Sequence, residues 1–63
     1  MGPARKHVLE LLGDGSGQFL ISTVADETNS SYSTARVHLR ELLKLGLVTR
    51  VTRYGRDFYS RSV

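Results

Sequence analysis

The stretch STARVHLRELLKLGLV, residues 33–48, decides how this chain folds. Ala35, Leu39, Leu42 and Leu43 stand at i, i+4, i+7 and i+8, the spacing of an apolar stripe along one face of an α-helix. Gly46 ends this periodicity, and the residues after it change to β-branched and aromatic types interleaved with polar ones. The stretch therefore predicts an amphipathic helix over 32–45, followed directly by a β-strand.

A shorter helix is predicted just before the long one, over residues 23–28. Ser22 is a candidate N-cap for it, because its hydroxyl can accept a hydrogen bond from a free backbone amide of the first turn. Asn29 can close the short helix in a left-handed conformation. Ser31 is the candidate N-cap of the long helix, so only a three-residue junction separates the two helices.

The N-terminal part predicts a further helix, which begins at Pro3 or Ala4 and stops at Gly13. Residues 13–17, Gly-Asp-Gly-Ser-Gly, then form a linker or turn, because they follow a helix and not the strand that a dinucleotide-binding loop requires. Residues 18–21 are rich in β-forming side chains and predict a brief strand or extended segment.

The C-terminal part predicts a β-hairpin with strands over 47–53 and 57–61 and a turn at 54–56. The element order is then αβααββ. We therefore expect an α+β fold in which three helices precede a C-terminal hairpin.

Each strand of this hairpin holds an adjacent pair of large apolar residues, Leu47-Val48 and Phe58-Tyr59. Neighbouring strand residues point to opposite faces of a sheet, so both members of a pair cannot face the same side of an ideal strand. The sequence leaves open which member of each pair faces the core.

Length and composition favour a small binding module over an enzyme. The chain has 63 residues and no cysteine, so neither a disulfide nor a thiolate metal site is available to stabilise it. We expect residues 1–63 to form one domain, since so short a chain hardly encloses a substrate cleft. No apolar run resembles a membrane span or a signal peptide, so we expect a cytoplasmic protein. We also expect no catalytic residues, metal or cofactor.

The charge is distributed unevenly along the chain. Up to Ser31 there are two basic and four acidic residues, a balance of −2, whereas from Tyr32 onward seven basic and two acidic residues give +5. A basic half of this kind suits a polyanion such as the phosphate backbone of a nucleic acid, although a solubilising basic surface has the same composition.

The two adjacent helices match a helix-turn-helix, in which the longer helix offers its N-terminal half to the major groove of DNA. Small polar residues near that end allow close approach, and the positive end of the helix dipole favours phosphates. Ser31, Ser33 and Thr34 fit this role.

Residues 33–42 with Gly46-Leu47-Val48 resemble the recognition helix and following strand of winged helix-turn-helix regulators. They are similar to the ArsR and MarR families and to small phage and archaeal repressors, and Gly55-Arg56 with Phe58-Tyr59 resembles their wing. The resemblance implies that Arg56 lies at the wing tip near the minor groove. It also implies that one set of residues on the long helix faces the groove, namely Ser33, Thr34, Arg36, Val37 and Arg40. A second set, Ala35, Leu39 and Leu42, holds the helix in place.

The predicted function is sequence-specific binding of double-stranded DNA by a repressor-like transcriptional regulator. The recognition helix 32–45 enters the major groove, and the wing 47–61 lies on the backbone or in the minor groove. The predicted contact residues are Ser31, Tyr32, Ser33, Thr34, Arg36, Val37, Arg40, Lys44, Arg50, Arg53, Tyr54 and Arg56.

Alternatives stay open for several of these residues. The arginines of the hairpin would also protect an exposed edge against pairing with other chains, and Tyr32 would equally well pack against the short helix. For the whole chain, the alternatives are a winged helix that contacts other proteins in a larger assembly, and an RNA ligand.

We also expect a homodimer on a two-fold-related site, because one small recognition helix reads few base pairs. Leu9 is a candidate to face the second copy, because it is an apolar residue of the short first helix that the core does not require. With no cysteine-based metal sensor of the ArsR kind, no small-molecule effector is expected.

Overall fold

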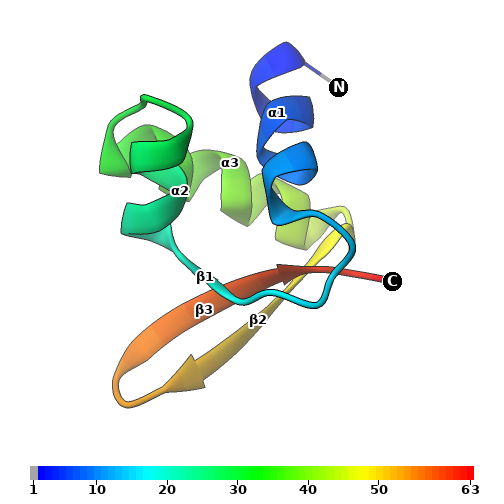
Figure 1. The fold of residues 1–63 in the computed structure, drawn as a ribbon, viewed down its shortest axis with the longest axis vertical. Coiled ribbons are helices and arrows are strands. Elements are labelled where there is room, and N and C mark those ends of the chain that lie inside the picture. The colour runs from blue at the N-terminus through cyan, green and yellow to red at the C-terminus, as the bar shows by residue number, and fades with distance from the viewer. Residues whose placement is uncertain (1) are drawn as a thin grey trace.

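The computed structural model describes residues 2–63, which form three helices and one three-stranded antiparallel sheet. The helices lie together on one side of the sheet (Figure 1). The element order is the predicted αβααββ, so the α+β winged helix-turn-helix architecture expected from the sequence is confirmed. The elements are α1 Pro3–Leu12, β1 Phe19–Leu20, α2 Ile21–Glu27, α3 Tyr32–Lys44, β2 Val48–Arg53 and β3 Arg56–Arg61.

The hairpin closes through a turn of two residues, Tyr54 and Gly55, and Arg53 lies opposite Arg56 at its base. Both turn residues have a positive φ, +52° and +72°, which is typical of the type I′ turns that match the twist of a hairpin. The predicted turn at 54–56 is therefore one residue too long, because Arg56 pairs within the sheet and begins β3.

The register of the sheet decides which member of each adjacent apolar pair faces the helices. Tyr59 lies opposite Arg50 in β2, and Val48 comes two residues before Arg50, so all three side chains share the helix-facing side. Tyr59 and Val48 are each only 2% exposed. Phe58 lies on the outer face and is half-buried, and Leu47, just before β2, is 37% exposed.

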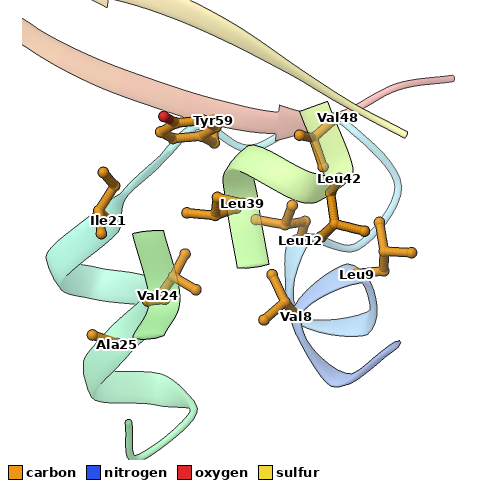
Figure 2. Packing of buried hydrophobic residues seen from close by; sticks show 11 residues of the cluster. Val8, Leu9, Leu12, Ile21, Val24, Ala25, Leu39, Leu42, Val48 and Tyr59 are labelled. Carbon is orange, nitrogen blue, oxygen red and sulfur yellow. The ribbon is translucent and has the colours of Figure 1, made fainter. Parts of the chain in front are cut away.

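The hydrophobic core lies between the helices and the sheet, with Tyr59 and Val48 contributed by the strands (Figure 2). The apolar stripe predicted for the long helix is confirmed at Ala35, Leu39 and Leu42, which are all 0% exposed. The complete cluster comprises Val8, Leu9, Leu12, Ile21, Val24, Ala25, Ala35, Leu39, Leu42, Val48 and Tyr59.

The prediction that Leu9 faces a second copy is wrong. Leu9 is 8% exposed and packs in the core of its own chain. The reason is that α1 packs against α2, α3 and β3, so Leu9 is covered together with Val8 and Leu12. Leu9 therefore offers no free apolar surface.

The N-terminus of α3 is capped as predicted. The Ser31 Oγ accepts a hydrogen bond from the Thr34 backbone N–H at 3.1 Å and donates one to the Thr34 Oγ1 at 2.9 Å. Asn29, with φ +53°, adopts the predicted left-handed conformation after α2. The helix-turn-helix junction is thus formed by local hydrogen bonding that the sequence already indicates.

The prediction that Ser22 caps the short helix is wrong. Helix α2 begins earlier, at Ile21, and its N-cap residue is Leu20, which makes no side-chain capping hydrogen bond. Leu20 pairs with Phe58 in the sheet, and Ile21 is only 7% exposed. Sheet pairing and burial of Ile21 therefore set the start of α2, in place of a polar cap.

Arg61, at the end of β3, joins the sheet to the end of α1. Its Nη1 donates to the backbone oxygens of Leu9 at 3.4 Å and Gly13 at 3.3 Å. Carbonyls at a helix C-terminus lack partners within the helix, and a cation there also interacts favourably with the helix dipole. One of the basic residues of the C-terminal half thus serves the fold. Within residues 2–63, no helix has the length and apolar character needed to cross a bilayer.

Candidate nucleic-acid interface

Helix α3 separates a buried face from an exposed, basic one. The supporting residues Ala35, Leu39 and Leu42 point into the core, whereas the side chains one to two positions away lie on the outside. The exposed face carries the predicted groove-facing residues and the basic residue of the last turn, namely Ser33, Thr34, Arg36, Val37, Arg40 and Lys44. This face is therefore free to meet a partner.

A hollow of about 430 Å³ lies between α3 and the hairpin. Three guanidinium groups line it, from Arg36 and Arg40 on α3 and from Arg50 on β2. Arg50 reaches this side because it lies opposite the buried Tyr59 and shares its face of the sheet. The helix and the wing thus contribute basic side chains to one concave surface.

A second hollow, of about 380 Å³, extends this basic surface toward the C-terminal end of α3. Arg40 and Arg50 line both hollows, and Lys44 is added in the second one. Val37, which is 55% exposed, provides an apolar contact there. Four basic residues thus line the two hollows, and the Glu41 carboxylate lies beside them in the second one.

The arginines of the hairpin lie on two different faces of the sheet. Arg50 points toward the helices. Arg53 and Arg56 lie opposite each other in the register and belong to the other face. Tyr54, in the turn, is 97% exposed. The turn lies at the opposite end of the sheet from the C-terminus (Figure 1), so the tip of the wing projects as an exposed basic and aromatic end.

Tyr32, in the first turn of α3, is 56% exposed and lines the hollow beside Arg36. It also lines a third hollow, of about 400 Å³, whose other lining residues include Ser22, Gly55 and Arg56. Ile21 of α2 borders both hollows as well, and Tyr32 offers more than half of its surface to solvent.

Ser31 and Thr34 use part of their hydrogen-bonding capacity on each other. The Ser31 hydroxyl donates its hydrogen to Thr34, whereas the Thr34 hydroxyl keeps its own hydrogen free to donate. Thr34 is therefore better placed than Ser31 to donate to a phosphate oxygen.

Sequence reasoning missed several residues of this surface. Ser22, Glu41 and Asp57 line the hollows, and Arg61 is diverted to α1. Asp57 and Arg61 lie two residues before and after the buried Tyr59, so the alternation of a strand was the signal that could have placed both on the helix-facing side. No comparable signal existed for Ser22, or for the partners of Arg61 in α1, because these surroundings come from distant parts of the chain.

The linker after α1 holds a carboxylate whose pKa is lowered by neighbouring hydrogen bonds. The Ser16 hydroxyl and backbone N–H both donate to the Asp14 carboxylate and hold the pKa of that group below its usual value, but Asp14 is fully exposed in the linker after α1. Among residues 2–63, no three His, Cys, Asp or Glu side chains gather where they could hold a metal ion.

A short helix, a tight junction, a longer exposed helix and a hairpin define the winged helix-turn-helix class. No protein-family model matches the chain, and neither does any curated protein. Solved structures do match it, and these include two structures from Mycobacterium bovis and one human enzyme.

The first is the crystal structure of a fragment of a possible transcriptional regulatory protein from Mycobacterium bovis, with a TM-score of 0.88 and 26% identity over 98% of this chain and 64% of that one. The second is a solution structure of the same fragment, described as the homodimeric winged helix-turn-helix DNA-binding domain of a possible ArsR-family regulator. It has a TM-score of 0.86 and 26% identity, and the match covers 98% of this chain and 56% of that one.

The third is human N-acetylserotonin methyltransferase in complex with SAM, with a TM-score of 0.81 and 25% identity. The match covers 94% of this chain but 17% of the methyltransferase. The chain thus spans less than two thirds of each of these proteins, and the same fold occurs both in regulators and within a much longer enzyme.

Proposed function

We propose that this chain binds double-stranded DNA and acts in the regulation of transcription, in the manner of a repressor. Helix α3 enters the major groove, and the β2–β3 wing lies on the adjacent backbone or in the minor groove. The observation that carries the proposal is the shared hollow to which α3 and β2 together contribute Arg36, Arg40 and Arg50. The likeness to regulator DNA-binding domains supports it.

The roles of the basic residues follow from their positions. Arg36 and Arg40 lie one turn apart on the exposed face of α3, where guanidinium groups can form paired hydrogen bonds with a guanine edge. Lys44 and Arg50 flank this face and contact phosphates, which position the protein without reading sequence. Arg53, Tyr54 and Arg56 form the tip that meets the neighbouring groove.

We further propose that two copies bind a two-fold-related site. The solution structure from Mycobacterium bovis is described as homodimeric, and one recognition helix reads too few base pairs for a specific site. Leu9 has no part in this dimer, because it is buried within its own chain. Light scattering of the eluting protein, free and bound to its site, checks the proposal, and a single-chain mass in both states would contradict it.

A salt titration tests DNA binding. Each neutralised phosphate releases counterions, so affinity for a duplex should fall by orders of magnitude between about 50 and 200 mM salt. Arg50→Gln should lower the slope of this dependence, whereas Lys6→Gln, an equal loss of charge on the distant helix α1, should leave it unchanged. Selection from a random duplex pool would then identify the site.

The second candidate function is contact with another protein. The same fold also occurs within a methyltransferase, as a minor part of its chain, so the fold by itself does not fix the kind of partner. An apolar protein interface predicts little change of affinity with salt, so the same titration separates the two functions. Competition with double-stranded RNA and single strands tests an RNA ligand, because an α-helix cannot enter the deep, narrow major groove of A-form RNA.

No effector or cofactor enters this proposal. A regulator of this kind would work in the cytoplasm, with the nucleoid, where its DNA is found.

A further inference from the structure

Two of the hollows described above lie next to each other. The hollow beside Arg36 and the hollow beside Arg56 share three lining residues, Ile21, Tyr32 and Asp57. We call the two adjoining hollows together the trough, which lies between the helix-turn-helix and the wing. Arg36, Arg40 and Arg50 line one of them, and Arg56, beside the hairpin turn, borders the other.

Asp57 carries the negative charge at the middle of this trough. Among the residues that line its two hollows, Asp57 is the one with a carboxylate. Its Oδ1 accepts a hydrogen bond of 2.7 Å from the Thr52 Oγ1, directly opposite in β2, and the residue is half-buried. This hydrogen bond, which lies at the surface, favours one orientation of the carboxylate.

A carboxylate in this position repels the phosphate groups of a nucleic-acid backbone in the trough. Thr52 is two residues from Arg50, so Asp57 and Arg50 are diagonal neighbours on the same face of the hairpin. The carboxylate hence weakens the attraction of Arg50 for any phosphate that comes near both. Binding to arbitrary DNA depends almost wholly on such phosphate contacts, whereas binding to a preferred site also depends on base contacts.

We propose that Asp57 is a specificity-determining residue, which lowers the affinity of the trough for arbitrary duplex DNA more than for the preferred site. In the preferred complex the base contacts of α3 set the register, so phosphates lie away from the carboxylate. On DNA that lacks the preferred site no register is favoured, and repulsion by Asp57 excludes some of the positions in which the protein could bind. This inference rests on the proposed function.

Asp57→Asn tests the inference, since the amide oxygen can still accept from Thr52 while the charge is lost. The matched control is Asp14→Asn, which also removes one negative charge and keeps an acceptor for Ser16, but lies in the linker after α1. We expect Asp57→Asn to raise affinity for an arbitrary duplex about threefold to tenfold near 100 mM salt, and for the selected site less than about twofold. Asp14→Asn should change both by less than about twofold.

Several outcomes would overturn the inference. An equal gain for the two variants would mean that net charge alone acts, and an equal gain on both duplexes would mean that Asp57 has no role in discrimination. If circular dichroism shows that Asp57→Asn is unfolded, Asp57→Ser replaces it, with the same expected direction. If wild-type protein binds no duplex, the proposed function fails and this inference with it; if it binds and the variants behave alike, only this inference fails.

Discussion

Arg53 and Arg56 lie directly opposite each other across the hairpin, on either side of the two-residue turn Tyr54–Gly55. Like charges at directly opposed positions destabilise a β-pair. Tyr54 adds a cost in backbone strain, because residues other than glycine and asparagine rarely adopt its φ of +52°. Both features lower the stability of the wing tip. A bound phosphate would relieve the repulsion between the two arginines.

The first prediction concerns this tip. Tyr54→Asn should stabilise the free protein by about 0.5–1 kcal/mol, because asparagine tolerates the left-handed conformation better. The same change should weaken DNA binding, since it removes an aromatic ring that is almost fully exposed at the proposed interface. Urea denaturation and a DNA titration measure the two effects. Tyr54→Asn protein with unchanged stability and unchanged affinity would show that Tyr54 has neither role.

The second prediction separates base reading from backbone contact on α3. Arg36→Ala should reduce the preference for the selected site over a mismatched one by about 1–3 kcal/mol. Lys44→Ala should weaken binding to all duplexes alike and lower the salt slope by about one phosphate contact. Titrations of both variants on matched and mismatched duplexes measure this difference. Identical behaviour of the two variants would refute the assignment of separate roles.

The third prediction concerns the core beneath the recognition helix. Leu39 is 0% exposed, so Leu39→Ala should lower the free energy of unfolding by about 2–5 kcal/mol through lost burial and an unfilled cavity. In a domain this small, such a loss takes up most of the stability. Leu45→Ala is the control, because Leu45 is 60% exposed and should cost less than about 0.5 kcal/mol. Chemical denaturation of both variants provides the comparison.

The fourth prediction concerns the cap that begins α3. Ser31→Ala removes the acceptor for the Thr34 amide and should cost about 1 kcal/mol. Ser31→Asp restores an acceptor and should recover most of this loss. Ser33→Ala, within the first turn but without a capping bond, should leave thermal stability nearly unchanged. Equal melting temperatures for Ser31→Ala and Ser33→Ala would contradict the capping role.

The fifth prediction concerns pH. Hydrogen bonds from Ser16 favour the ionised Asp14 carboxylate and lower its pKa in the folded protein below the value of 3.8 for an unperturbed group. The resulting stabilisation is present above pH 3.8 and is lost as the pH falls through the lower folded pKa. NMR titration of the Asp14 carboxyl measures the shift. Ser16→Ala should move the pKa back up, and an unmoved value would exclude Ser16 as its cause.

Local features of the fold follow closely from local sequence. The long helix was predicted over 32–45 and ends at Lys44, and both the Ser31 cap and the left-handed Asn29 are where the sequence indicates them. These features depend on interactions within one or two turns of the chain, so the neighbouring residues already contain the information. The start of α2 differs because Leu20 is drawn into pairing with β3, far along the chain.

The candidate site divides in the same way. A basic, exposed face along α3 follows from the sequence, because helical spacing separates Arg36 and Arg40 from the apolar stripe. Three other features become visible in the folded chain alone: Arg50 joins this face while Arg53 lies on the other side of the hairpin, Arg61 binds α1, and Asp57 lines the trough. The physical reason is that strand register and the packing of distant segments set these contacts, and a single residue of register moves every side chain to the opposite face.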